Sequence, residues 1–180
     1  EQFTNLFLPS LLFSAGVHDV EVSNCFFGGH LEVDSTTCYN LTFSHNTFHD
    51  SVTGGSFQIS HFINTTFIDN VFKSNANGID TSGNNLFINN VALSNSIILP
   101  ATGGNVSGVS PGSMFALPYS RLEVDQYVLP SFTPQNVGMY GGTNPYNPVK
   151  LPPVPSIFYL DVPDVIQSNS STITISTRSN

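Results

Sequence analysis

A repeat of 20 to 24 residues in the first half of the chain limits its possible folds more than any other feature of the sequence. One column of the repeat holds a cysteine followed by three asparagines, at Cys25, Asn46, Asn70 and Asn90. An apolar side chain stands three positions before each column residue, at Val22, Phe43, Phe67 and Phe87. Another stands two positions after each, at Phe27, Phe48, Phe72 and Ala92. The pattern predicts four copies of one short structural unit.

Each unit carries at least two short stretches in which apolar and polar residues alternate, which is typical of β-strands. A unit of this length cannot bury its apolar side alone, so successive units must stack about 4.8 Å apart with hydrogen bonds between strands. The repeat therefore predicts an all-β fold, a parallel β-helix of about four coils over residues 17–99. We expect the column asparagines at buried turns, where they bond backbone groups of neighbouring coils and tolerate left-handed geometry.

The position five residues before the column is less regular. It reads Val20, Leu41, Thr65 and Asn85, so it is apolar in the first two units only. We interpret this change as decay of the repeat toward its C-terminal end.

Charge and hydropathy exclude two classes of partner. Four Lys and Arg against twelve Asp and Glu give a net charge of -8, and no basic cluster could neutralise a run of phosphates. Nucleic acid is therefore not an expected partner. The apolar stretch from Leu6 to Ala15 is interrupted by Pro9, Ser10 and Ser14 and is too short to insert into a membrane. No cofactor is expected.

The coil motifs are similar to those of a known family. Val20-x-Val22-x-x-Cys25-x-Phe27 and its counterpart from Leu41 to Phe48 resemble coils of right-handed parallel β-helix proteins. This pectate-lyase-like solenoid family includes pectate lyases and many secreted bacterial surface proteins. Segments 110–113 and 136–142 resemble the part of such proteins that returns to cover the last coil. The resemblance implies the C-terminal region of a secreted or cell-surface bacterial protein, with further coils upstream.

The second half of the chain differs in composition. Most of the prolines fall in residues 100–155, which predicts closing loops and a Pro-rich linker rather than a second core. Alternating residues from Ile157 to Val162 and from Thr172 to Ser176 predict a C-terminal β-hairpin. We therefore divide the chain into coils at 1–99, cover and linker at 100–155, and a strand tail at 156–180.

Carboxylates are the first candidates for catalysis, because β-helix enzymes that cut polysaccharides use acidic residues on an exposed strand face. The candidates in the repeat region are Asp34, Asp50, Asp69 and Asp80. No two of them share a register in adjacent coils, whereas hydrolysis needs two carboxylates about 5 to 10 Å apart. We favour solvated turn residues over a catalytic role.

Histidine and cysteine suggest no metal site. The five histidines are spread around the coil in register and do not stack, at His18, His30, His45, His49 and His61. Cys25 takes the place of a column asparagine and is expected to be buried. Whether it forms a disulfide with Cys38 is left open by the sequence.

Tyrosines of the second half are candidates for sugar binding, because a tyrosine at a loop rim can stack on a sugar ring. Those outside the tail strands are Tyr119, Tyr127, Tyr140 and Tyr146. The competing interpretation, which we favour, is packing of the cover on the last coil.

These observations predict a non-catalytic, secreted or cell-surface structural or adhesive module with polysaccharide as its ligand. One alternative is a polysaccharide hydrolase or lyase that uses the carboxylates named above. The other is a subunit of a self-assembling extracellular filament, because segment 1–16 is too apolar to stay in water. It would be covered by another copy or by upstream coils.

Overall fold

The computed structural model describes the residues at 1–9, 11–14, 16–28, 31–33, 37–49, 62–73, 83–93, 99–117, 122, 125–148, 156–161 and 174–178. Contacts divide the chain into two units, residues 1–148 and 149–180, which are considered separately below. The predicted boundaries at 99 and 155 stay predictions. Within the described ranges, no helix has the length and apolar character needed to cross a membrane.

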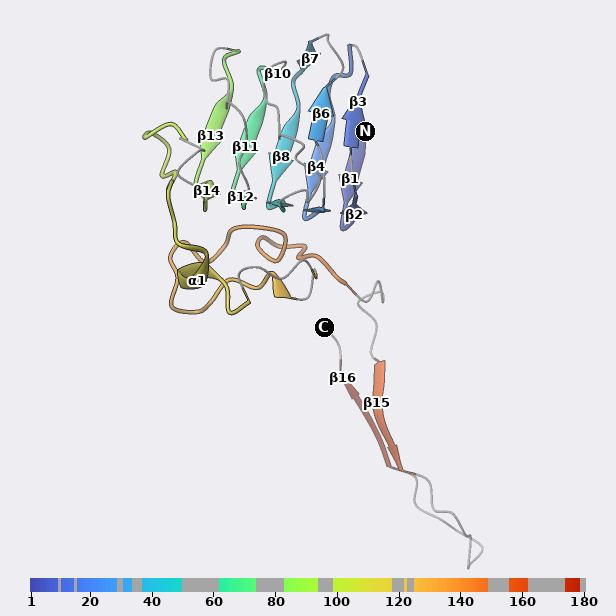
Figure 1. Cartoon of the computed structure of the whole chain (residues 1–180). Coiled ribbons are helices and arrows are strands. Elements are labelled where there is room, and N and C mark those ends of the chain that lie inside the picture. The colour runs from blue at the N-terminus through green and yellow to red at the C-terminus, as the bar shows by residue number, and fades with distance from the viewer. Residues whose placement is uncertain are drawn as a thin grey trace, which may run out of the picture. The chain divides into compact units, whose positions relative to one another are not determined.

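Parallel β-sheets make up most of the first unit (Figure 1). Sheet 1 contains five strands: β1 (Gln2–Thr4), β4 (Glu21–Ser23), β8 (Thr42–Ser44), β11 (Thr66–Ile68) and β13 (Leu86–Ile88). These strands lie side by side in that order, and each pairs in parallel with its neighbour. The expected all-β, parallel arrangement is confirmed.

Each strand of sheet 1 is followed along the chain by a strand of sheet 2, and the strands of sheet 2 lie side by side in the same order as those of sheet 1. Sheet 2 contains β2 (Phe7–Leu8), β5 (Phe26–Phe27), β9 (Thr47–Phe48), β12 (Val71–Phe72) and β14 (Val91–Ala92). Two further parallel pairs join β3 (Leu11–Phe13) to β6 (Leu31–Val33) and β7 (Cys38–Tyr39) to β10 (Phe62–Ile63).

The predicted apolar columns lie inside this stack of strands. Val22, Phe43, Phe67 and Phe87 are aligned across sheet 1 and buried. The Phe43 and Phe67 rings stack with centroids 5.1 Å apart, and the Phe67 and Phe87 rings at 4.9 Å. Side chains at alternate positions of the same strands face outward, as the period of two requires.

Two sharp corners flank every inner strand of sheet 1. At each corner one residue has a positive φ. Among the described residues, the nine other than glycine that do so are all Asn, Asp or His: Asn5, Asp19, Asn24, Asn40, His45, Asn64, Asp69, Asn84 and Asn89. These residue types tolerate left-handed geometry better than other L-residues, although it still carries a cost. The corners keep each strand of sheet 1 to three residues.

Segment 106–148 is here called the cover segment, and apolar side chains among its described residues pack on the outward side of sheet 2 (Figure 1). The short helix α1 (Pro111–Met114) places Met114 and Phe115 in a buried cluster with Val71 and Val91. Met139 and Tyr146 are buried against Phe26 in a second cluster. Sheet 2 is therefore enclosed on both sides.

The second unit contains one antiparallel pair of strands, β15 (Ser156–Asp161) and β16 (Thr174–Arg178). The pair lies in the part of the sequence where alternation predicts a hairpin. The register shifts between Ile157 and Tyr159.

Candidate functional site

The column asparagines form a buried ladder of amides at the corner between sheets 1 and 2. The Oδ1 atom of Asn70 accepts hydrogen bonds from the backbone N–H of Asn46 at 2.9 Å and from its Nδ2 at 3.1 Å. The Nδ2 atom of Asn70 donates to the Phe43 carbonyl at 2.8 Å and to Oδ1 of Asn90. The side chain of Asn70 thus satisfies groups in two neighbouring units.

The ladder is continuous from Cys25 to a final rung that sequence reasoning missed. Asn90 repeats the bonds of Asn70, with Asn105 as its acceptor. Asn105 donates to the carbonyls of Phe87, Pro100 and Thr102 and so completes the C-terminal end of the row. Its place in the column was obscured because it follows Asn90 by only 15 residues.

The opposite corner of sheet 1 uses similar bonds only in its last two units. The backbone N–H of Thr65 donates to Oδ1 of Asn85 at 2.9 Å, and Nδ2 of Asn85 donates to the Phe62 carbonyl. Leu41 and Val20 fill the same position in the earlier units and are buried. The change from apolar to polar side chains at this position therefore adds one amide, that of Asn85, and it leaves the parallel register of β8, β11 and β13 intact.

The corner between sheets 1 and 2 that carries the amide ladder is here called the ladder corner. Its left-handed residues also bind part of the cover segment. Nδ2 of Asn24 donates to the carbonyls of Met139 at 3.1 Å and Gly141 at 2.8 Å. The backbone N–H of Gly138 donates to the Asp69 carbonyl at 2.7 Å. These bonds fix residues 138–141 along the corner.

His45 lies between this part of the cover segment and the strands. Its Nδ1 is 3.1 Å from the Asn136 carbonyl oxygen, and its Nε2 is 3.7 Å from Oδ2 of Asp69. Burial raises the pKa of the Asp69 carboxyl, and the nearby His45 partly offsets this rise. A Cβ atom on Gly142 would lie 2.8 Å from Cδ2 of His45, so the chain passes close to the imidazole only because this residue is glycine.

A polar groove of about 390 Å³ opens between the outer face of sheet 1 and the cover segment. This volume is within the range of small-ligand sites, about 300 to 1,000 Å³. Its lining consists of Gln2, Thr4, Glu21, Ser23, Asn24, Ser44, His45, Asn136, Gly142, Thr143 and Asn144. Apart from Gly142 these are hydroxyl and amide side chains, one imidazole and one carboxylate.

The polar groups of the groove are partly fixed by bonds between adjacent strands. Nε2 of Gln2 donates to Oε2 of Glu21 at 3.1 Å, and Oγ of Ser23 donates to Oγ1 of Thr4 at 3.3 Å. Hydroxyl and amide groups can each donate and accept, so the lining can exchange hydrogen bonds with a ligand rich in hydroxyls.

Catalytic carboxylates are not brought together here. Glu21 is the one carboxylate of the lining, and Asp69 lies behind His45 instead of in the groove. Asp34, Asp50 and Asp80 lie outside the described residues. The sequence did contain a signal for the contact between His45 and Asp69, because both stand one position before the asparagine column.

The candidate tyrosines have different positions. Tyr127 is 57% exposed and stacks on Tyr140, with ring centroids 3.7 Å apart. Tyr146 is buried and contacts Tyr140 edge to face, which agrees with packing of the cover. Tyr119 lies outside the described residues.

Cysteine and histidine do not create a reactive centre among the described residues. Cys25 and Cys38 are both buried and free, which answers the disulfide question left open by the sequence. No group of three or more potential metal ligands is found in the described ranges. His49 is buried against the Phe26 ring, and His18 contacts the Asp19 carboxylate. His30 and His61 lie outside those ranges.

The chain matches no protein-family model, no curated protein and no solved structure.

Proposed function

We propose that this chain is a non-catalytic, secreted or cell-surface module that binds a neutral polysaccharide in the polar groove. We propose further that its parallel units are closed coils of a right-handed β-helix. The observation that carries the functional proposal is the lining of the groove, in which hydroxyl and amide side chains predominate and Glu21 is the one carboxylate. A glycan presents hydroxyl groups that such side chains recognise.

Charge favours a neutral glycan over an acidic one. The chain has a net charge of -8, so its overall field repels polyanions. The described lining of the groove contains no Lys or Arg to offset that repulsion.

Binding of neutral oligosaccharides to the full chain, measured by calorimetry, tests the proposal. Ser44→Tyr would fill the groove and should weaken binding at least tenfold. Thr66→Tyr is the matched control, because Thr66 is an outward, half-buried residue of the same sheet that does not line the groove. The control should bind within twofold of the wild type. Equal effects of the two substitutions, or no binding by any neutral glycan, would contradict the proposal.

The same titrations separate binding from catalysis. A module without an assembled carboxylate pair should return the oligosaccharide unchanged. Shortened products that disappear when Asp34, Asp50, Asp69 or Asp80 is replaced by Asn would instead favour the hydrolase or lyase alternative.

Self-association is a second candidate function, which the strand edge favours. Within the described part of the chain, β1, β2 and β3 each pair on one side only, and Leu12 in β3 is 61% exposed. Unpaired edges of this kind accept further strands, either from a second copy or from coils upstream in a longer chain. Light scattering should show association that increases with concentration and is lost in Leu12→Lys. Leu117→Lys, at an exposed site of the cover segment, should leave it unchanged. A monomer at all concentrations would refute assembly of this chain.

A further inference from the structure

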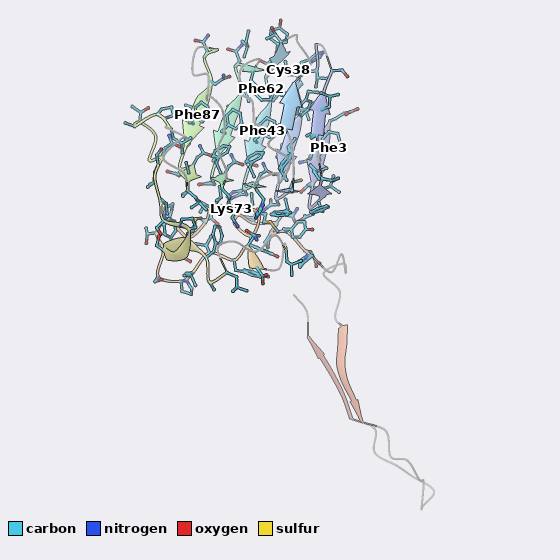
Figure 2. The ribbon with its side chains drawn as sticks, viewed as in Figure 1. Phe3, Cys38, Phe43, Phe62, Lys73 and Phe87 are labelled. Atoms are coloured by element: carbon cyan, nitrogen blue, oxygen red, sulfur yellow. The ribbon has the colours of Figure 1, made fainter. Side chains whose placement is uncertain are left out.

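Lys73 is a half-buried amine between the repeat and the cover segment (Figure 2). Its backbone N–H donates to the Phe48 carbonyl at 2.8 Å, which anchors the residue directly after β12. The side chain extends to the cover segment, where Nζ lies 4.8 Å from the centre of the Phe115 ring. The groove and its proposed glycan ligand do not involve this residue.

The Nζ atom contacts the side-chain amide of Gln126. It lies 2.7 Å from Oε1, and Gln126 is only 2% exposed. Nε2 of Gln126 donates to the Leu122 carbonyl at 2.9 Å, so both ends of the amide are held. The amide carbon is one bond away from the oxygen that the amine contacts.

Burial also makes this amine more nucleophilic than an ordinary lysine. It lowers the pKa of Lys73 to about 8, and the charge of Asp125 partly opposes the change. An exposed lysine has a pKa of about 10.4, so at pH 8 it is almost entirely protonated, whereas about half of Lys73 is the neutral amine. Only the neutral amine can attack a carbonyl carbon.

We propose that Lys73 and Gln126 join in an intramolecular amide cross-link between the repeat and the cover segment. Nζ attacks Cδ of Gln126, a bond forms between Nζ and Cδ, and the bond between Cδ and Nε2 breaks. Nε2 leaves as ammonia with the proton that Nζ gives up. The step transfers the acyl group of the Gln126 side chain from Nε2 to the amine of Lys73, and it needs no oxidant, reductant or other reactant.

The 2.7 Å hydrogen bond from Nζ to Oε1 holds the amine beside the amide, and the reaction requires Nζ to turn from Oε1 toward Cδ. Intramolecular reactions between well-oriented groups have effective molarities of about 10⁵ to 10⁸ M. The product would close a covalent loop across 53 positions of the chain and fasten the cover segment to β12.

Intact mass spectrometry of the denatured full chain tests the proposal after incubation between pH 7 and pH 9. The mass should be lower than the sequence mass by one ammonia, and the rate of loss should rise with pH and level off above about pH 8. Peptide mapping should identify one branched peptide that joins Lys73 to Gln126. Loss of ammonia at an asparagine would give the same change in mass but no branched peptide, so the map distinguishes the two reactions.

Variants provide the matched controls. Lys73→Arg keeps the positive charge but removes the nucleophile, and it should keep the full sequence mass. Gln135→Ala removes a different glutamine of the cover segment and should still lose ammonia. Asp125→Asn removes the charge that opposes the fall in the pKa of Lys73, so the loss of ammonia should level off at a lower pH, at the same site. If the wild type keeps its full mass and gives no branched peptide, the contact is only a hydrogen bond and the proposal is wrong. This result would leave the glycan-binding proposal intact.

Discussion

The two corners of sheet 1 face the same geometric requirement and meet it with different side chains. Both turn the chain through a left-handed Asn, Asp or His residue, and both must pair the backbone groups that the turn frees. The ladder corner carries amides from Asn46 to Asn105, whereas the opposite corner has Val20 and Leu41 in its first units.

The two corners also differ in whether the cover segment contacts them. The cover segment lies on the ladder corner, where Asn24 and Asp69 bond residues 138–141. At the opposite corner Asn40 and Asp19 are exposed and bond each other. The amides are therefore most continuous at the corner that the cover segment contacts.

The largest expected effect is the loss of an inner rung of the ladder. Asn70→Ala would leave the Phe43 carbonyl and the Asn46 N–H buried without partners, so we expect a loss of about 4 kcal/mol in the free energy of unfolding. Asn85→Ala removes two bonds at a half-buried corner and should lose about half as much. Urea denaturation of both variants measures the difference, and equal losses would contradict the comparison.

The next effect concerns the contact between the cover segment and the ladder corner. Gly142→Ala adds a Cβ atom 2.8 Å from His45 at a φ of 77°, so we expect a loss of about 2 kcal/mol. Gly16→Ala is the control, because its φ is 75° and nothing lies within 4 Å of an added Cβ. It should lose about 1 kcal/mol, from backbone strain alone. Thermal denaturation that shows no difference between the two would mean that the cover segment adapts freely around His45.

A smaller effect is expected at the opposite corner. Thr65→Val removes a side-chain bond to the Ile63 carbonyl that is 3.4 Å long, and its backbone bond to Asn85 stays in place. The earlier units already carry Val20 and Leu41 at this position, so the change should cost about 1 kcal/mol or less. A loss as large as that of Asn70→Ala would show that this corner depends on polar groups as strongly as the ladder does.

The smallest effect is expected for Cys25, which begins the ladder column without an amide. Burial raises the pKa of its thiol to about 11, so below pH 9 the folded protein should resist alkylation until it unfolds. The unfolded thiol loses its proton first as the pH rises, so this group contributes stability below about pH 9 that is lost toward pH 11. Alkylation followed by mass spectrometry checks the first expectation, and rapid labelling of the folded chain would contradict it.

Spacing alone predicted much of the repeat region. The column of Asn46, Asn70 and Asn90 and the inward phenylalanines were identifiable because each unit repeats the same alternation. The amide bonds of Asn85 at the opposite corner were not predicted, because Thr65 and Asn85 break an apolar pattern and a single sequence does not show which bonds a polar side chain makes there.

The side of the groove that the cover segment supplies could not be derived from the sequence. The hydrogen bond from Asn24 to Gly141 joins residues 117 positions apart, and no periodic pattern links the repeat to the cover segment. The alignment of His45 with Asp69 could be inferred from the sequence, since each stands one position before a column asparagine. Its importance depends on Asn136 and Gly142, which the coil pattern does not place.

The asparagine ladder also gives the stack of strands a direction. From Asn46 to Asn105, Nδ2 of each amide donates to Oδ1 of the next, so the amide dipoles align head to tail. Aligned amides polarise one another, which strengthens the bonds inside the row more than those at its ends. Such a row can be extended only by another that points the same way, because two Oδ1 ends repel each other. The ladder therefore fixes the orientation of any further rung that joins it.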